Sequence, residues 1–374
     1  VKAGASIGNA AWPADPARNS YTFRGWFTGE NGAGVQFASA TPVNASMTVY
    51  AKWTYSGGNG GGSDDSALST RATPTYNADF KAGSGAPATL PVTVDKNSGI
   101  ARIDIGSHKL TSGGTVITIP PIPDIDTYSV GIPVSDLAAA GKEGTLTVET
   151  GIGSITVASN MLTGVSEISV SKAEISIGQG DKDNLPDDVK SAIGDKPLIQ
   201  LTLSIDGQQT DWNNPDAPVT VSIPYTPTAE ELANPENIVI WYIDGSGNVV
   251  TVPNGHYDPV TGTVTFTTTH FSAYAVAYND VSFNDVATGA WYNKAVGFIA
   301  ARGITYGTGN GNFSPEAKLT RGQFVVMLLK AYGIAPAANS TGNFADAGNT
   351  WYTGYLAAAK HLRISAGVGN NLFA

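Results

Sequence analysis

In the middle of the chain, apolar and polar residues alternate one by one over several short stretches. The alternation is clearest in residues 199–205 and 219–225, and residues 145–149 repeat it. Successive side chains of a strand point to opposite faces, so a period of two with one apolar face predicts half-buried antiparallel strands. Residues 244–248 (DGSGN) and Asn254-Gly255 lie between such stretches and are typical of hairpin turns. We therefore expect antiparallel, β-sandwich-like modules in this part of the chain.

The strand-rich segment is long for a single sandwich, so we expect two modules, residues 72–165 and 166–279. Three short stretches interrupt the strand pattern, residues 134–140, 186–193 and 228–232. We predict a short helix for each of them. The fold class expected for the whole chain is therefore multidomain and mainly β, with helices confined to connections until the C-terminal segment.

Residues 1–55 contain two short aromatic strands, residues 21–27 (YTFRGWF) and 47–53 (MTVYAKW), with a glycine-containing loop at residues 29–34. The next stretch, residues 56–71, is rich in Gly, Ser and Asp. Such a composition is typical of a flexible linker. We therefore predict a small N-terminal β-domain that a linker separates from the central modules.

From residue 280 onward the apolar positions change to helical spacing, in residues 290–301 and 324–331. The large residues of this segment also recur at intervals of 60 or 61 positions. The recurring set is Phe283, Trp291, Ile304 and Phe313, followed by Phe344, Trp351, Ile364 and Phe373. Near-equal spacing over four points indicates tandem units. We predict two α-helical repeats, residues 280–335 and 336–374, of which the second is truncated.

Composition removes several classes of function. The chain has 374 residues, a formal net charge of −10 and only 14% charged residues. Nucleic-acid binding needs clustered Lys and Arg, so we expect no nucleic-acid partner. The absence of cysteine excludes disulfides, thiol nucleophiles and Cys-type zinc sites. No apolar run approaches the roughly 18 residues that span a bilayer, so no membrane span is expected.

A set of short motifs runs in fixed order through the first helical repeat. They are Phe283-Asn-Asp-Val286, Trp291, Gly303-Ile304, residues 311–315 (GNFSP) and Leu319-Thr-Arg321. In order and spacing the set resembles the S-layer homology repeat of Gram-positive surface proteins. The resemblance implies non-covalent attachment to secondary cell-wall polysaccharide, often bearing pyruvyl ketals. It also implies an extracellular location, associated with the cell wall or S-layer.

The N-terminal strands match the signatures G-Y-x-F-x-G-W and T-L-Y-A-x-W, with Ser20 for the first Gly and Val49 for Leu. They resemble the internalin-type B repeat, also called the Listeria–Bacteroides repeat, a small β-grasp-like module. Its opening strand should lie upstream of Val1, so we interpret the unit as partial and the chain as an internal piece of a longer protein. The resemblance leaves two functions open: a spacer, or an adhesion unit that binds a host or neighbouring surface protein.

An anionic polysaccharide would need a local cationic pocket on a protein of this charge. Thr320 is a credible N-cap, and Gln323 three residues later completes a capping box. This arrangement places Arg321 in the first helical turn, where a sugar carboxylate would meet a guanidinium and free backbone N–H groups. Capping alone for Thr320 and Gln323, and a solvated surface position for Arg321, are the alternatives. The usual family motif is T-R-A-E, so the departure to T-R-G-Q removes one carboxylate.

Four further residues complete the candidate polysaccharide-binding set, because they match motif positions near the family's ligand groove: Asp285, Trp291, Gly303 and Gly307. Each has a structural alternative. Asp285 would serve as a cap or turn residue, Trp291 as a core aromatic, and the two glycines as helix terminators. Family members usually form the groove between neighbouring repeats, three to a module. One and a half repeats are therefore expected to bind poorly alone.

We find no motif for an enzyme, metal or cofactor. The four histidines lack metalloprotease spacing, and the G-x-S-x-G pattern at residues 4–8 lacks the strand and helix that a nucleophile needs. The acidic cluster from Asp181 to Asp188 lacks the Gly and Glu of a calcium loop. We predict a non-enzymatic surface protein, with β-modules as spacers or adhesion units. The rival hypothesis is a wall-anchored polysaccharide hydrolase whose catalytic domain lies outside this fragment.

Overall fold

The computed structural model describes most of the chain, in segments that are separated by short gaps. They are residues 5–8, 12, 16, 21–28, 36–39, 41–43, 48–55, 76–106, 110–138, 144–163, 172–339 and 341–374. The chain divides into two compact units, Val1–Arg71 and Ala72–Ala374, and each is considered by itself. No helix among the described residues is long and apolar enough to cross a bilayer.

The N-terminal unit contains two small sheets. Their strands are β1 (Ala5–Ser6), β2 (Tyr21–Phe27), β3 (Gln36–Phe37), β4 (Pro42–Val43) and β5 (Tyr50–Tyr55). Strand β2 lies between β3 and β5, and β1 pairs with β4; all these pairs are antiparallel. The two aromatic strands predicted from the sequence are β2 and β5. Phe37 is buried and stacks on Trp12, with ring centroids 5.8 Å apart.

Two predictions for the N-terminal part lie outside the described residues: the glycine-containing loop at residues 29–34 and the linker at residues 56–71.

Strands dominate the part of the second unit that ends at residue 278, which we call the β-body. Its strands are β6 (Tyr76–Ala82), β7 (Ala88–Asp95), β8 (Ile100–Asp104), β9 (Thr115–Thr118), β10 (Thr127–Pro133), β11 (Thr145–Glu149), β12 (Ser154–Ala158), β13 (Lys172–Gln179), β14 (Leu198–Ile205), β15 (Gln208–Gln209), β16 (Val219–Pro224), β17 (Ile238–Ile243), β18 (Val249–Val252), β19 (His256–Asp258), β20 (Thr263–Thr268) and β21 (Ala273–Tyr278). Its helices are α1 (Val134–Leu137), α2 (Asp187–Ile193), α3 (Ala229–Ala233) and the 3₁₀ turn η3 (Pro235–Asn237). The three predicted short helices are therefore confirmed.

The alternating sequences form strands in the predicted way. In β14, Ile199, Leu201 and Leu203 are buried, and the polar residues between them are partly exposed. Strand β16 repeats the pattern. The predicted turn between β17 and β18 is closed by the carboxylate of Asp244, which accepts hydrogen bonds from the N–H groups of Ser246 and Asn248.

Neighbouring strands connect the β-body in one path, in the order β18-β17-β21-β14-β13-β10-β8-β7-β6-β9-β11-β12-β16-β20-β19. Strand β7 joins the two halves of this path, because its residues 88–92 pair with β6 and its residues 93–95 pair with β8. Most pairs are antiparallel, but β8–β10 and β9–β11 are parallel. The alternation predicts a purely antiparallel arrangement, so the parallel pairs are a difference. They arise because the chain alternates between the two halves of the path: β8 and β10 lie in one half, and β9 and β11 lie in the other.

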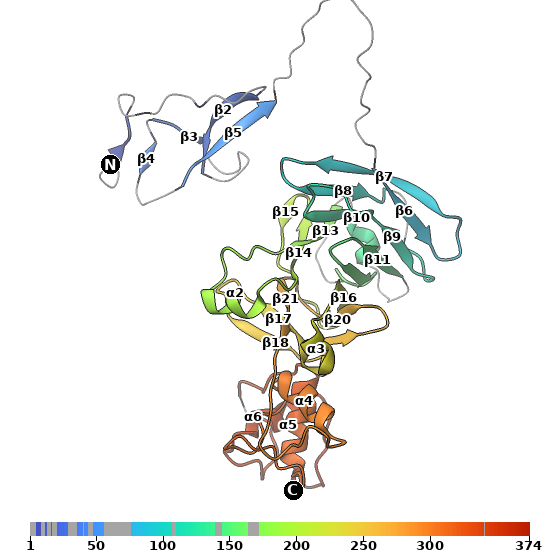
Figure 1. The fold of residues 1–374 in the computed structure, drawn as a ribbon, viewed down its shortest axis with the longest axis vertical. Helices are drawn as coiled ribbons and strands as arrows, with labels where there is room; N and C mark the ends of the chain where they lie inside the picture. The colour runs from blue at the N-terminus through green and yellow to red at the C-terminus, as the bar shows by residue number, and fades with distance from the viewer. Residues whose placement is uncertain are drawn as a thin grey trace, which may run out of the picture. The chain divides into compact units, whose positions relative to one another are not determined.

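The structure does not separate residues 72–165 from residues 166–279. Strand β10 pairs with β13 over seven residues, and β12 pairs with β16. One hydrophobic cluster includes buried residues from Ala78 to Val276. In Figure 1, β13 and β14 run between the teal strands β6–β11 and the yellow strands β17 and β20. Pairing between distant strands therefore joins what local patterns suggest are two modules.

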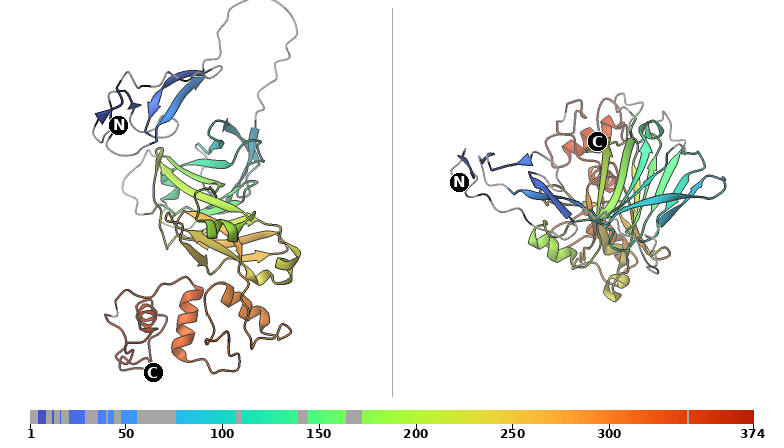
Figure 2. Two further views of the ribbon diagram at one scale, coloured as in Figure 1. Left: turned by 60° about the vertical axis from the view of Figure 1, so that its left-hand side comes forward. Right: turned by 90° about the horizontal axis from the view of Figure 1, so that it is seen from above.

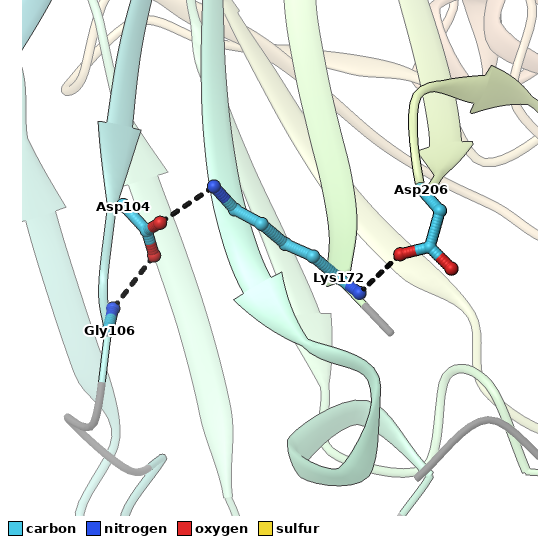
Figure 3. A network of polar contacts seen from close by, with 4 residues as sticks. All are labelled: Asp104, Gly106, Lys172 and Asp206. Carbon is cyan, nitrogen blue, oxygen red and sulfur yellow. Dashed lines mark hydrogen bonds and ion pairs between the residues drawn. The ribbon is translucent and has the colours of Figure 1, made fainter. Parts of the chain in front are cut away.

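Lys172, the first residue of β13, illustrates this junction (Figure 3). Its side chain crosses β10 at Gly131, where a Cβ atom would overlap the lysine Cε. Its Nζ donates to Asp104 Oδ2 (2.7 Å), and its N–H donates to Asp206 Oδ1 (3.0 Å). The hydrogen bonds from Lys172 and from the N–H of Gly106 hold the pKa of Asp104 below its usual value. Strands on both sides of residue 165 are thus linked at the surface.

The last part of the second unit is helical, with α4 (Asn293–Ala301), α5 (Arg321–Ala331) and α6 (Thr353–His361). Helix α5 lies between α4 and α6 (Figure 2, left). Helices α5 and α6 bury a separate small core around Leu329 and Leu356. Residues 280–335 are called the first repeat below, and residues 336–374 the second.

Candidate functional site

The two repeats share a turn that is held by an aspartate. The carboxylate of Asp285 accepts hydrogen bonds from the N–H groups of Phe313 (2.8 Å) and Ser314 (2.7 Å). Asp346 makes the same pair of bonds one repeat later, to Phe373 (2.7 Å) and Ala374 (2.8 Å). These backbone hydrogen bonds lower the pKa of both aspartates. Both oxygens of Asp285 are therefore engaged in holding the turn.

A glycine in each repeat makes room for this turn. Gly307 has φ +76°, and a Cβ there would overlap the carbonyl oxygen of Asn312 and lie 2.7 Å from the ring of Phe283. Gly367 is placed in the same way, against Leu372 and Phe344. Only glycine fits both the backbone angle and the space. Gly307 is therefore required because the Asn312 carbonyl and the Phe283 ring approach its Cα closely.

Helix α4 is followed by Arg302 and then by Gly303, which has φ +65°. The N–H of Ile304 returns to the carbonyl of Ile299 (3.0 Å), as in a helix that ends with a left-handed residue. The Nζ of Lys330, in α5, donates to the carbonyl oxygen of Gly303 (3.3 Å). At the equivalent position after α6, Arg363 has φ +58°.

The predicted capping box begins α5. The side chain of Thr320 accepts from the N–H of Gln323 (3.2 Å), and the N–H of Thr320 donates to Gln323 Oε1 (2.9 Å). The box places Arg321 in the first turn of α5 as expected. Gly322 is buried, and a Cβ there would lie 3.3 Å from the ring of Tyr352. The glycine that replaces the family's usual alanine thus accommodates an aromatic side chain of the second repeat.

Arg321 reaches across to the second repeat. Its guanidinium donates to the carbonyl oxygen of Phe373 and to Ser365 Oγ (3.2 Å). The guanidinium carbon also lies 4.4 Å from the centre of the Phe373 ring. Within the described part of the chain, Arg321 has no carboxylate within ion-pair distance. Its charge is therefore not neutralised by a salt bridge there, and its hydrogen bonds tie the two repeats together.

A cavity of about 400 Å³ lies beside these residues, between the first repeat and one side chain of the second. Its wall includes the stretch from Ile304 to Thr308 and the α5 residues Gln323 and Lys330. Lys318 and Lys330 contribute positive charge, and no Asp or Glu is among its described lining residues. Trp351 is the second repeat's contribution to the wall. The cavity therefore combines a flat aromatic surface with two cations.

Comparison with known proteins identifies two regions of the chain. Residues 282–325 match the S-layer homology domain, and residues 1–52 match the Listeria-Bacteroides repeat domain. This chain carries an S-layer homology domain. The matched region covers most of the first repeat and ends in α5.

Similar proteins fall into two classes. An S-layer protein of Bacillus thuringiensis subsp. finitimus is 26% identical over 117 residues, 31% of this chain. The amylopullulanase of Thermoanaerobacterium thermosulfurigenes is 29% identical over 192 residues, 51% of this chain. The exoglucanase XynX of Acetivibrio thermocellus is 32% identical over 98 residues, 26% of this chain. The chain spans only 14%, 10% and 9% of the length of these relatives, respectively.

These findings indicate a protein of the cell surface that is associated with the cell wall, because an S-layer homology domain implies wall anchoring. The resemblances found in the sequence, to the S-layer homology repeat and to the Listeria–Bacteroides repeat, are confirmed. The relatives include both S-layer proteins and glycosidases.

The S-layer homology domain brings only some of the predicted site residues to the cavity. Gln323 and Gly307 line it. Thr320 and Arg321 lie at the start of α5, the same helix as Gln323, but are not among the lining residues. Asp285 and Gly303 hold turns of the same repeat. A polysaccharide contact stays a prediction for all of them.

Trp291, predicted to bind polysaccharide with a core aromatic as the alternative, is not a core residue and does not line the cavity. Its side chain is 92% exposed, and its ring makes an edge-on contact with Tyr292, at 5.5 Å between centroids. Its equivalent, Trp351, is 67% exposed and lines the cavity. Motif matching favours Trp291 because it lies in the matched region, residues 282–325. The 60-residue periodicity is the signal for Trp351, since a groove between repeats takes its second wall from the following unit.

Proposed function

We propose that the cavity between the two repeats of the S-layer homology domain binds an anionic segment of secondary cell-wall polysaccharide, such as a pyruvylated sugar. The observation that carries this proposal is the charge of the lining, with Lys318 and Lys330 and no described carboxylate. The chain as a whole has a net charge of −10. At long range the protein therefore repels a polyanion. Binding then requires a local cationic site.

The lining side chains have complementary roles in this proposal. Trp351 offers a flat apolar face to a sugar ring, and Lys318 and Lys330 supply positive charge for the sugar's acid group. Lys330 is held in place, because its Nζ bonds the Gly303 carbonyl and lies 4.9 Å from the centre of the Tyr306 ring. Arg321 supports the cavity from outside, by fixing the second repeat and with it Trp351.

The role of the positive charge in the cavity lining can be tested by substituting one lysine. We expect Lys318→Gln to weaken binding of purified, pyruvylated wall polysaccharide about tenfold, as loss of one charge-assisted contact does. The matched control is Lys294→Gln, because Lys294 is also an exposed lysine of the first repeat but does not line the cavity. Isothermal titration at two salt concentrations measures both variants. Equal binding by Lys318→Gln and the wild type would remove the proposed cationic role.

We further propose that the β-body and the N-terminal unit are non-enzymatic spacer or adhesion elements. The match to the Listeria-Bacteroides repeat domain supports such a role for residues 1–52. The test is a pull-down of host and neighbouring surface proteins with the N-terminal unit, with the β-body as control. Specific capture would favour adhesion, and the absence of any capture would favour a spacer.

A second candidate function is a wall-anchored polysaccharide hydrolase whose catalytic domain lies outside this chain. It is favoured by two relatives that are named as an amylopullulanase and an exoglucanase. The gene around the encoding segment distinguishes the candidates. A glycosidase domain encoded there would favour the hydrolase, and further Listeria–Bacteroides repeats would favour adhesion.

A further inference from the structure

Arg302, directly after α4, is the most deeply buried charged side chain of the first repeat, with only 3% of its surface exposed. Its guanidinium donates to backbone carbonyl oxygens of the β-body: Glu236 (2.7 Å), Ile238 (3.0 Å) and Gly255 (2.9 and 2.5 Å). A further bond returns to the carbonyl of Phe298 (3.1 Å), whose ring centre lies 3.6 Å from the guanidinium carbon. One side chain therefore joins α4 to three separate points of the β-body.

The guanidinium is charged at neutral pH although no ion pair with a described residue compensates it. Burial lowers the pKa of Arg302 to about 10, and the charge of Glu236 opposes that shift. Among the described residues, no carboxylate lies within ion-pair distance of Arg302. A buried cation is costly unless hydrogen bonds replace its hydration. The carbonyl oxygens of η3, β17 and the turn at Gly255 supply those bonds.

Other contacts surround this arginine. Ala301 is buried against Val239 and Ala277 of the β-body. The side chain of Asn279 donates to the carbonyl of Ala301 (2.7 Å). Gly297 permits close approach, because a Cβ there would lie 3.1 Å from Asn237 Oδ1. The junction is thus packed as well as hydrogen-bonded.

The second repeat lacks the features of this junction. Leu362 occupies the position equivalent to Arg302 and is 54% exposed. Ala357 occupies the position equivalent to Gly297. The contacts to the β-body are therefore special to the first repeat and do not belong to the repeat fold itself.

We propose that the edge of the β-body formed by η3, β17 and the turn at Gly255 is a docking surface for the first S-layer homology repeat. It caps the repeat array at its N-terminal side and holds it in one orientation. Arg302 is the positioning residue of this surface. The wall anchor and the β-body then move as one rigid body, rather than as two domains on a flexible connection.

Spin labels test the orientation directly, because the chain has no cysteine of its own. Val260 in the β-body and Lys294 in α4 are exposed and are replaced by cysteine in the full chain. Pulsed electron resonance then measures the distance between the two labels. We expect a single narrow distribution in the otherwise unchanged protein. A broad distribution in that protein would by itself overturn the proposal.

Arg302→Met removes the donors and keeps an unbranched side chain in place of the aliphatic stem. We expect it to broaden the distance distribution and to speed amide exchange in α4 about a hundredfold, with α6 unchanged. The matched control is Arg363→Met, which removes the arginine just after α6 and should change neither reading in α4. If Arg302→Met unfolds both repeats, the arginine is needed for the repeat fold itself. If Arg302→Met changes neither the distance distribution nor the exchange in α4, the arginine does not position the first repeat. Either result contradicts the proposed role of Arg302.

Discussion

The first and second repeats share one backbone frame but have different neighbours. The aspartate that holds the turn and the glycine that admits it recur at Asp346 and Gly367 with almost the same distances. The residues that face outward from the frame differ in their surroundings. Trp291 is exposed and Trp351 lines a cavity, while Arg302 is buried against the β-body and Leu362 is exposed. Contacts within each repeat therefore determine its fold, and the neighbour on each side determines the surroundings of its outward-facing residues.

The largest expected effect tests the shared frame. Gly307→Ala places a Cβ against the Asn312 carbonyl at φ +76°, so we expect a loss of about 3 kcal/mol of stability in the repeats. Gly367→Ala should cost a similar amount in the second repeat. Gly309→Ala is the control, because it has φ +105° but no atom within 4 Å of the added Cβ. Thermal melting of the helical circular dichroism signal measures all three, and equal losses for Gly307→Ala and Gly309→Ala would contradict the steric account.

An intermediate effect is expected where the two frames differ in sequence. Gly303 and Arg363 each lie two residues after a helix, and both have a positive φ, of +65° and +58°. Gly303→Ala should destabilise the first repeat by about 1–2 kcal/mol, because a side chain disfavours this conformation. Arg363→Gly should stabilise the second by up to about 1 kcal/mol. The same melting experiment checks the opposite signs, and destabilisation by Arg363→Gly would show that its side chain makes a necessary contact.

The smallest effect concerns pH. The pKa values of Asp285 and Asp346 are lowered in the folded state by backbone hydrogen bonds. Their stabilisation is therefore present above the unfolded pKa of about 3.9 and is lost as pH falls through the lower folded value. Asp285→Asn and Asp346→Asn should each flatten the loss of stability in acid. Of the two aspartates, only Asp346 is also stabilised in its charged form by Arg321. Added salt should therefore reduce the effect of Asp346→Asn on stability more than that of Asp285→Asn. Acid titrations at two salt concentrations check both points, and an unchanged acid profile in either variant would contradict them.

Local sequence predicts the local structure well. The alternation of residues 199–205 corresponds to a strand with its apolar face buried, and the capping box at Thr320 and Gln323 forms as expected. Both depend on side chains only a few positions apart. The 60-residue periodicity likewise identifies the two repeats from the positions of their large residues alone.

Features that depend on distant partners are not accessible from the sequence. Segment length suggests a division near residue 165, but β10 pairs with β13 across it. Arg302 matches no motif, and its importance comes from carbonyl groups almost fifty or more positions away. Trp351 escapes motif matching because the matched motifs lie in the first repeat, within residues 282–325. In each case the decisive contact joins segments that the chain keeps far apart.

In our proposal the ligand site lies between the repeats and uses the tryptophan of the second one. Binding of purified, pyruvylated wall polysaccharide to Trp351→Ala and Trp291→Ala, measured side by side with the wild type, tests it most directly. Both tryptophans are largely exposed and occupy equivalent positions, so each substitution controls for the other. We predict that Trp351→Ala weakens binding about tenfold and Trp291→Ala leaves it unchanged. The reverse pattern, or equal losses in the two variants, would contradict the account.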